Sequence, residues 1–222
     1  MLRQLPRWAW IGGGLLALVA GSINAVGYLC FRHQPITHLT GTSTEFGLAL
    51  AQLDTGEIVH WALAIASFLA GAVLSGYIVQ QRTLQLGRRY GVVLMIESAL
   101  LFAATPLIHD RQDLGLYLAS AACGLQNAMV STYSGATFRT THLSGMFTDL
   151  GIYLGQRLRG LEVDMLRIHV CLLVITSFIA GATAGALGFM VLQERVLLVP
   201  AALTGVVGLG YAIYRQRVWA GR

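Results

Sequence analysis

Residues 37–47 read THLTGTSTEFG, and residues 141–151 read THLSGMFTDLG. Six of the eleven positions are identical, and the acidic position is conserved in type, as Glu45 in the first segment and Asp149 in the second. A recurrence of this length, about 100 residues apart, predicts that the chain contains two copies of one structural unit.

Two further matches occur in the same order and support this interpretation. GSINA at 21–25 matches GLQNA at 124–128, and SFLAGA at 67–72 matches SFIAGA at 177–182. We therefore predict an internal repeat within a single integral membrane domain over 1–222. The first copy covers approximately 8–110 and the second approximately 111–215.

The composition predicts a membrane protein. Of the 222 residues, 55% are hydrophobic and 11% are charged, whereas soluble domains carry about 25% charged residues. A spanning helix needs ~20 mostly apolar residues. Runs of this kind predict about six transmembrane helices, at 8–31, 60–80, 90–108, 114–135, 168–192 and 196–214.

Two helix-like stretches, 43–53 and 146–158, follow the repeated THL turns and are too short to cross a ~30 Å hydrocarbon core. We expect both to be re-entrant helices. Each copy then holds three spans, and an odd number of crossings inverts the second copy. The predicted fold is an all-α membrane protein with about six transmembrane helices, two short re-entrant helices and an inverted 3+3 repeat.

The arginines predict the orientation. With the N-terminus inside and the short helices not crossing, twelve of the fifteen Arg residues lie on the inner side, and Arg32, Arg111 and Arg195 lie outside. The positive-inside rule then places both termini in the cytoplasm. We expect a multi-pass protein of a bacterial inner membrane that contacts membrane lipid.

The repeated turns are the candidate binding site. Re-entrant helices direct their N-terminal amides and positive dipole ends toward the middle of the membrane, where a polar or anionic solute can bind. Gly41 and Gly145 permit close backbone approach, and Thr40 and Ser144 supply hydroxyl groups. Simple helix capping is the alternative for these hydroxyl groups.

Acidic and imidazole groups follow the same pattern. Glu45 and Asp149 each lie seven residues after a histidine, His38 or His142, and Glu97 lies alone within an apolar span. These five residues form a candidate proton relay or ion site. The alternative is a polar network that holds helices together.

The second copy differs from the first in Gln126 and Arg139, where the first has Ile23 and Pro35. Arg139 is a candidate partner for an anion or for Asp149, or a juxtamembrane charge. The full set of predicted solute- or ion-binding residues is Asn24, Thr37, His38, Thr40, Gly41, Glu45, Gln126, Asn127, Arg139, Thr141, His142, Ser144, Gly145, Thr148 and Asp149.

The composition also argues against several classes. The chain contains no Lys, which excludes a P-loop lysine or a Schiff base, and its three Cys residues form no CxxC pair. Seven-residue His–acid spacing matches no metal signature, so we expect no cofactor and no metal. The basic residues lie at span ends, which argues against nucleic acid. Small-residue stripes at 67–72 and 177–182 are most simply close-packing surfaces between helices, and where exposed they would permit a homodimer.

The repeated THL turns, GLQNA at 124–128 and the run from Arg139 to Gly151 resemble the YoaK family over nearly the whole chain. The family is expected to carry Asn where this chain has Thr42. The resemblance implies a multi-span bacterial inner-membrane protein of unknown function and brings no substrate.

From the residues, the function we expect is a secondary transporter or channel for a small polar or anionic solute or ion, with proton coupling as an option, and not an enzyme. Two alternatives stay open. One is a membrane-embedded enzyme that uses the His and carboxylate groups, with or without a metal. The other is a non-catalytic scaffold or partner subunit.

Overall fold

The protein is all-α in the computed structural model, which describes residues 7–31, 36–79, 89–134 and 139–220. The elements in chain order are α1 (Arg7–Cys30), α2 (Leu39–Gln52), α3 (Thr55–Ile78), α4 (Tyr90–His109), α5 (Asp113–Tyr133), α6 (Leu143–Leu158), α7 (Met165–Leu192), the 3-10 helix η1 (Gln193–Leu197) and α8 (Leu198–Ala220). Each of the eight predicted helical stretches overlaps an α-helix, with bounds that differ by up to a few residues.

Four helical stretches in the described part of the chain are long and apolar enough to cross a membrane: Arg7–Cys30, Thr55–Ile78, Tyr90–His109 and Met165–Ile213. The last of these stretches contains α7 and most of α8. The two helices are separate because α7 ends at Gln193, whose backbone has φ 55° and ψ −143°. α5 occupies the predicted position 114–135, but its polar side chains, among them Ser120, Gln126 and Asn127, lower its apolar character.

Two close helix pairs form the centre of the fold: α1 packs along α7, and α3 packs along α5. Glycines bring the backbones together at these crossings. A Cβ on Gly71 would overlap the carbonyl oxygen of Ala121, and a Cβ on Gly124 would overlap that of Phe68. Small residues at helix crossings are typical of membrane proteins, where close van der Waals contact replaces the hydrophobic effect.

The second pair uses the same contacts. A Cβ on Gly21 would overlap the carbonyl oxygen of Phe178, and one on Gly181 would overlap that of Leu18. The GSINA segment of α1 therefore meets the SFIAGA segment of α7, and GLQNA of α5 meets SFLAGA of α3. In both helix pairs, a segment of the GSINA/GLQNA type thus packs against a segment of the SFLAGA/SFIAGA type from the other half of the chain.

The small-residue stripes at 67–72 and 177–182 are thus occupied within the chain, by α5 and α1. This agrees with the expectation that the stripes are close-packing surfaces between helices, because their glycines contact a backbone of the same molecule. A homodimer stays a prediction.

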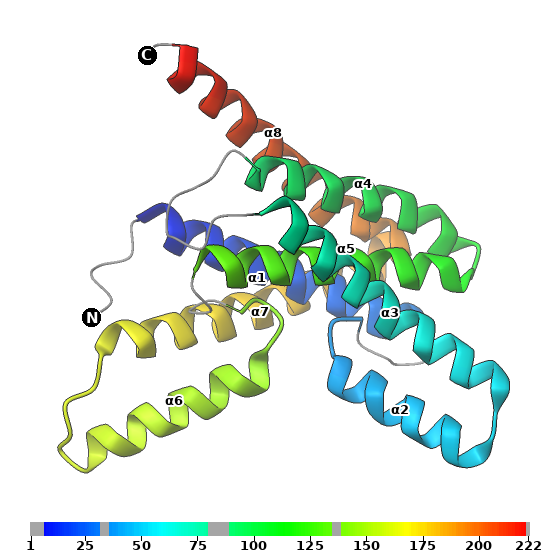
Figure 1. Ribbon diagram of the computed structural model, residues 1–222, viewed down its shortest axis with the longest axis horizontal. Coiled ribbons are helices and arrows are strands. Elements are labelled where there is room, and N and C mark those ends of the chain that lie inside the picture. Colours follow the sequence, from blue (N-terminus) through cyan, green and yellow to red (C-terminus); the bar gives the residue numbers. More distant parts are fainter. Residues whose placement is uncertain (1–6, 32–35, 80–88, 135–138, 221–222) are drawn as a thin grey trace.

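The two short helices lie on one side of the layer that α1, α3, α5 and α7 form (Figure 1). Their N-termini lie near each other beside the middle of the long helices, and from there α2 and α6 run toward opposite ends of the molecule (Figure 1). α2 packs on α3, and α6 packs on α7.

Aspartate N-caps join each short helix to the long helix that follows. Asp54 accepts hydrogen bonds from the amides of Gly56 and Glu57, at 3.0 and 3.1 Å, and starts α3. Asp164 accepts from the amide of Leu166 at 3.0 Å and starts α7. Asp is among the best N-cap residues because its carboxylate satisfies amides that lack a partner in the first turn.

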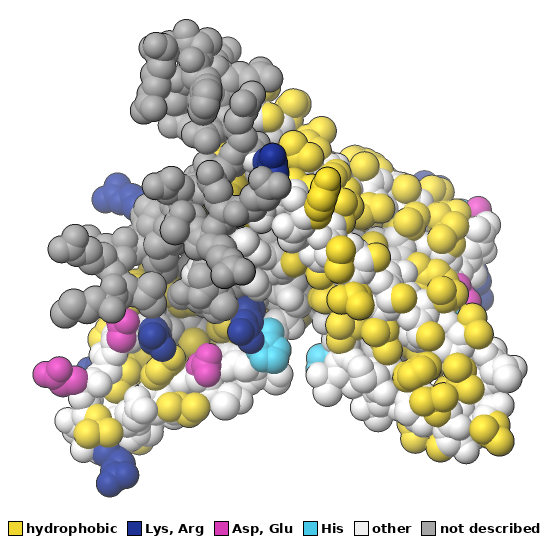
Figure 2. Space-filling view, in the orientation of Figure 1, with side chains coloured by type: hydrophobic (Ala, Val, Ile, Leu, Met, Phe, Trp, Pro, Cys, Tyr) yellow, Lys and Arg dark blue, Asp and Glu magenta, His cyan; other side chains and the backbone are white. Residues whose placement is uncertain are grey.

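Large apolar side chains cover the outward faces of the long helices, as on the right side of Figure 2. Leu69 and Val73 of α3 are about 60% exposed, as is Leu187 of α7. Such surface is unfavourable in water and suited to lipid, so these helices contact membrane lipid.

We expect Gly71→Ala to lower the free energy of unfolding by about 1–3 kcal/mol, because the added methyl group overpacks the contact with the Ala121 carbonyl. Thermal unfolding of the purified protein in detergent measures this change. Gly76→Ala is the matched control on the same helix, since a Cβ there meets no atom within 4 Å. An equal loss in both variants would contradict the prediction.

Candidate functional site

The two repeated turns line one cavity of about 200 Å³, although about 100 residues separate them in the chain. Its lining residues are Thr37, His38, Leu39, Thr40, Phe68, Asn127, Thr141, His142, Leu143 and Ser144. Figure 2 shows histidine surface on both sides of the notch between the lower two arms of the molecule. The cavity lies where the N-termini of α2 and α6 meet.

Hydrogen bonds to His38 in the turn itself and to Asn24 in α1 hold the first turn in place. The amide of Gly41 donates to Nδ1 of His38 at 3.2 Å, which makes the imidazole the N-cap of α2. Asn24 of α1 accepts from both the amide and the hydroxyl of Thr37, at 3.0 and 2.8 Å. Because Nδ1 accepts, the neutral ring carries its proton on Nε2 and offers a donor.

The second turn has the same course but fewer contacts. His142 is the N-cap residue of α6, yet its side chain makes no capping hydrogen bond. Its ring lies over Gly145, where a Cβ would overlap ring atoms Cδ2 and Nε2. Within the described part of the chain, the buried Oδ1 of Asn127 has no hydrogen-bond partner, unlike Oδ1 of Asn24. The second copy therefore holds an unsatisfied acceptor beside the cavity.

The helices begin earlier than the expected stretches at 43–53 and 146–158. α2 begins at Leu39 and α6 at Leu143, directly after each histidine. Gly41 and Gly145 therefore lie in the first helical turn, where the missing Cβ leaves room for the imidazole ring. The glycines serve ring packing within each turn.

The predicted acids lie outside the cavity lining. Glu45 is half-buried on α2, and Asp149 is exposed on α6, as is Arg139 just before that helix. Among the residues that the structure describes, no ion pair joins Asp149 to Arg139 or either acid to a histidine. The hydroxyl of Thr148 donates to the carbonyl of Ser144 at 2.9 Å, within its own helix.

Two more predicted residues lie deep between helices. Gln126 is fully buried and donates from Nε2 to the carbonyl of Leu16 at 2.7 Å, which ties α5 to α1. Glu97 is also fully buried on α4, and neither carboxylate oxygen has a hydrogen-bond partner in the described ranges. The 200 Å³ cavity is lined by neither residue.

One family model matches residues 13–210, and its description is protein of unknown function (DUF1275). The chain belongs to the DUF1275 family. The match contains both turns and all the residues that line the cavity, and it confirms the predicted resemblance to YoaK-like membrane proteins. The comparisons with curated proteins and with solved structures found no match to the chain.

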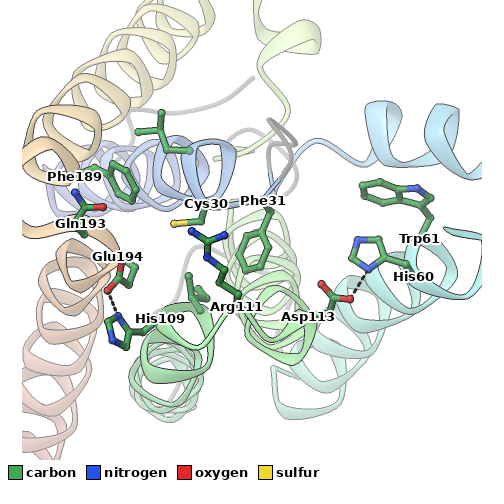
Figure 3. Close-up of a pocket in the computed structure, with 12 residues that line it drawn as sticks. Cys30, Phe31, His60, Trp61, His109, Arg111, Asp113, Phe189, Gln193 and Glu194 are labelled. Atoms are coloured by element: carbon green, nitrogen blue, oxygen red, sulfur yellow. Dashed lines mark hydrogen bonds and ion pairs between the residues drawn. The ribbon is translucent and has the colours of Figure 1, made fainter. Parts of the chain in front are cut away.

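A larger cavity of about 790 Å³ in this DUF1275 protein was missed by the sequence analysis. It lies at the end of the molecule where α1, α4 and α7 end and α5 begins (Figure 3). His60 and His109 line it, and each forms an ion pair with a carboxylate. The available signal was a histidine at the edge of each of two apolar runs, His60 before one and His109 after the other.

Replacing Asn24 and Asn127 tests the difference between the two turns. We expect Asn24→Ala to lower the free energy of unfolding by about 1–3 kcal/mol, because both donors of Thr37 lose their acceptor. Asn127→Ala is the matched control and should change stability by less, since Oδ1 of Asn127 has no partner to lose. Melting temperatures in detergent measure both changes, and the reverse order would refute the assignment.

Proposed function

We propose that this DUF1275 protein is a secondary transporter or channel for a small polar or anionic solute. The observation that carries the proposal is the single cavity lined by both repeated turns. It lies beside Phe68 and Asn127, which are near the middle of the long helices α3 and α5. Transporter sites are commonly found at this depth, between the two halves of a repeat.

In the proposed membrane arrangement, six helices span the bilayer and α2 and α6 are re-entrant. The packing of α1 with α7 and of α3 with α5 supports an inverted 3+3 repeat. A helix of the first half packs on one of the second half in both pairs, and the two pairs use corresponding sequence segments. The opposite directions of α2 and α6 in Figure 1 support one entry from each membrane face. Their shared starting point then lies at mid-depth.

Hydrogen-bond donors dominate the chemistry of the cavity. Two helix N-termini meet there, and each contributes free amides and a partial positive charge. Thr40 and Ser144 add hydroxyl groups, and the His38 ring adds a donor at Nε2. Asn127 Oδ1 is an acceptor for a donor group on the solute. This set favours an anion or a polar solute that carries acceptors.

We propose that His38 and His142 bind and release protons during transport, because these are the titratable groups among the described residues that line the cavity. Glu45, Asp149 and Glu97 lie elsewhere, so the described lining pairs no carboxylate with a histidine.

We place the protein in the bacterial inner membrane with both termini in the cytoplasm. The start of α1, the end of α8 and the α6–α7 connection lie at the same end of the molecule (Figure 1). In the sequence, this end holds most of the arginines. The positive-inside rule supports its cytoplasmic orientation.

Uptake into proteoliposomes tests the function. We expect the protein to accelerate the entry of at least one of formate, nitrate, urea and glycerol, measured by stopped-flow light scattering. His142→Ala should lower the protein-dependent rate by about tenfold, which corresponds to one lost hydrogen bond of roughly 1.4 kcal/mol to the solute. His142 makes no capping bond, so its removal should leave the fold intact.

His169→Ala is the matched control, because His169 is exposed on α7 and does not line the cavity. Its uptake rate and membrane abundance should equal those of the unchanged protein. The proposal is wrong if none of the four solutes enters faster than into empty liposomes. Equal slowing by His142→Ala and His169→Ala would refute the assigned site.

A further inference from the structure

The 790 Å³ cavity shares no lining residue with the cavity at the repeated turns. It is built by the ends of α1, α4 and α7, the first turns of α3 and α5, and η1 (Figure 3). This is the end opposite the α6–α7 connection, where the proposed topology has its outer face. A ligand bound here reaches the protein from the outer solution.

Two ion pairs occupy the acidic groups of this cavity. Nδ1 of His60 lies 3.3 Å from Oδ2 of Asp113, and Nδ1 of His109 lies 2.5 Å from Oε1 of Glu194. The first pair joins α3 to α5, and the second joins α4 to η1 (Figure 3). Each carboxylate thus faces an imidazole, the hydroxyl of Tyr117 also lies 3.1 Å from Nδ1 of His60, and these contacts join four elements around the opening.

Arg111 also lines this cavity and takes part in neither pair. Its guanidinium extends into the space between the two pairs, near Cys30 and Phe31 (Figure 3). In the part of the chain that the structure describes, no carboxylate lies within ion-pair distance of it. A guanidinium offers five donors in a fixed planar fork, which matches a carboxylate.

The backbone at Arg111 is left-handed, as it is at Leu53 and Gln193, which also lie where a helix ends. Its φ is 56°, in the left-handed region that side chains other than glycine rarely adopt. The turn between α4 and α5 would be more stable with glycine at this position.

Aromatic side chains supply the apolar part of the lining. Phe31 follows α1, Trp61 lies on α3 beside His60, and Phe189 lies near the end of α7. Phe31 and Phe189 are half-buried, so part of each ring is accessible. A cavity with one free guanidinium and apolar ring surface suits an organic anion better than an inorganic one.

We propose that this outer cavity binds a small organic carboxylate, with Arg111 contacting the carboxylate and Phe31 and Phe189 contacting the apolar part. The described residues contain no group of three or more metal-ligating side chains, and the two histidines here are already paired with acids. Binding at this cavity requires no residue of the two repeated turns.

Calorimetric titration of the purified protein in detergent tests the site, with benzoate, acetate and benzylamine as probes. Benzoate should bind, acetate should bind at least about tenfold more weakly because it lacks a ring, and benzylamine should not bind because its charge is positive. No benzoate binding, equal affinity for acetate, or binding of benzylamine as tight as that of benzoate would each overturn the proposal.

Arg111→Gly is the decisive variant. It removes the guanidinium and relieves the left-handed strain, so its melting temperature should equal or exceed that of the unchanged protein while benzoate affinity falls by about tenfold or more. Arg195→Ala is the matched control, since Arg195 is an exposed arginine of η1 that does not line the cavity. Unchanged benzoate affinity in Arg111→Gly, or an equal loss in Arg195→Ala, would refute the site.

His142→Ala separates this inference from the proposed transport function. That variant should bind benzoate with unchanged affinity, because His142 does not line the outer cavity. Loss of benzoate binding in His142→Ala would show that the probe occupies the other cavity and would overturn the assignment to Arg111.

Discussion

The fold depends on the close approach of helix backbones at two crossings, α1 with α7 and α3 with α5. At each crossing, glycines face a carbonyl oxygen of the partner helix at a distance that leaves no room for a Cβ. In a membrane, apolar side chains gain little by leaving lipid, so contact area at short range is the main attraction between helices. The crossings hold Phe68 and Asn127 in adjacent helices, and the central cavity forms beside these two residues.

The central cavity illustrates how one repeated sequence yields two unequal structures. Both turns place a histidine as N-cap and a glycine beneath its ring, but only His38 accepts the capping hydrogen bond. Likewise Asn24 binds Thr37, whereas Oδ1 of Asn127 has no partner among the described residues. A symmetric pair of turns would satisfy all its own groups. The unequal pair has one satisfied half and one half with groups available to a ligand.

Some of the predicted site residues line the cavity and others do not, and their distance along the helix from the repeated histidines decides which. Residues close to the repeated histidines line the cavity, because a helix N-terminus exposes its first amides and hydroxyls on the side from which the chain enters. Glu45 and Asp149 lie almost two turns further along their helices, and there the axes of α2 and α6 have already diverged (Figure 1). Spacing along one helix could not predict this, since the divergence is set by packing against α3 and α7.

By itself the sequence determined that the chain is an all-α membrane protein, approximately where its helices lie, and that one histidine-containing sequence occurs twice. These properties follow from apolar run length and from recurrence, which are local or one-dimensional signals. Only the tertiary structure decided which glycines meet, which asparagine lacks a partner, and that Arg111 stands between two ion pairs. These depend on helix crossings between residues far apart in the chain, and the geometry of a crossing arises only when both helices are placed.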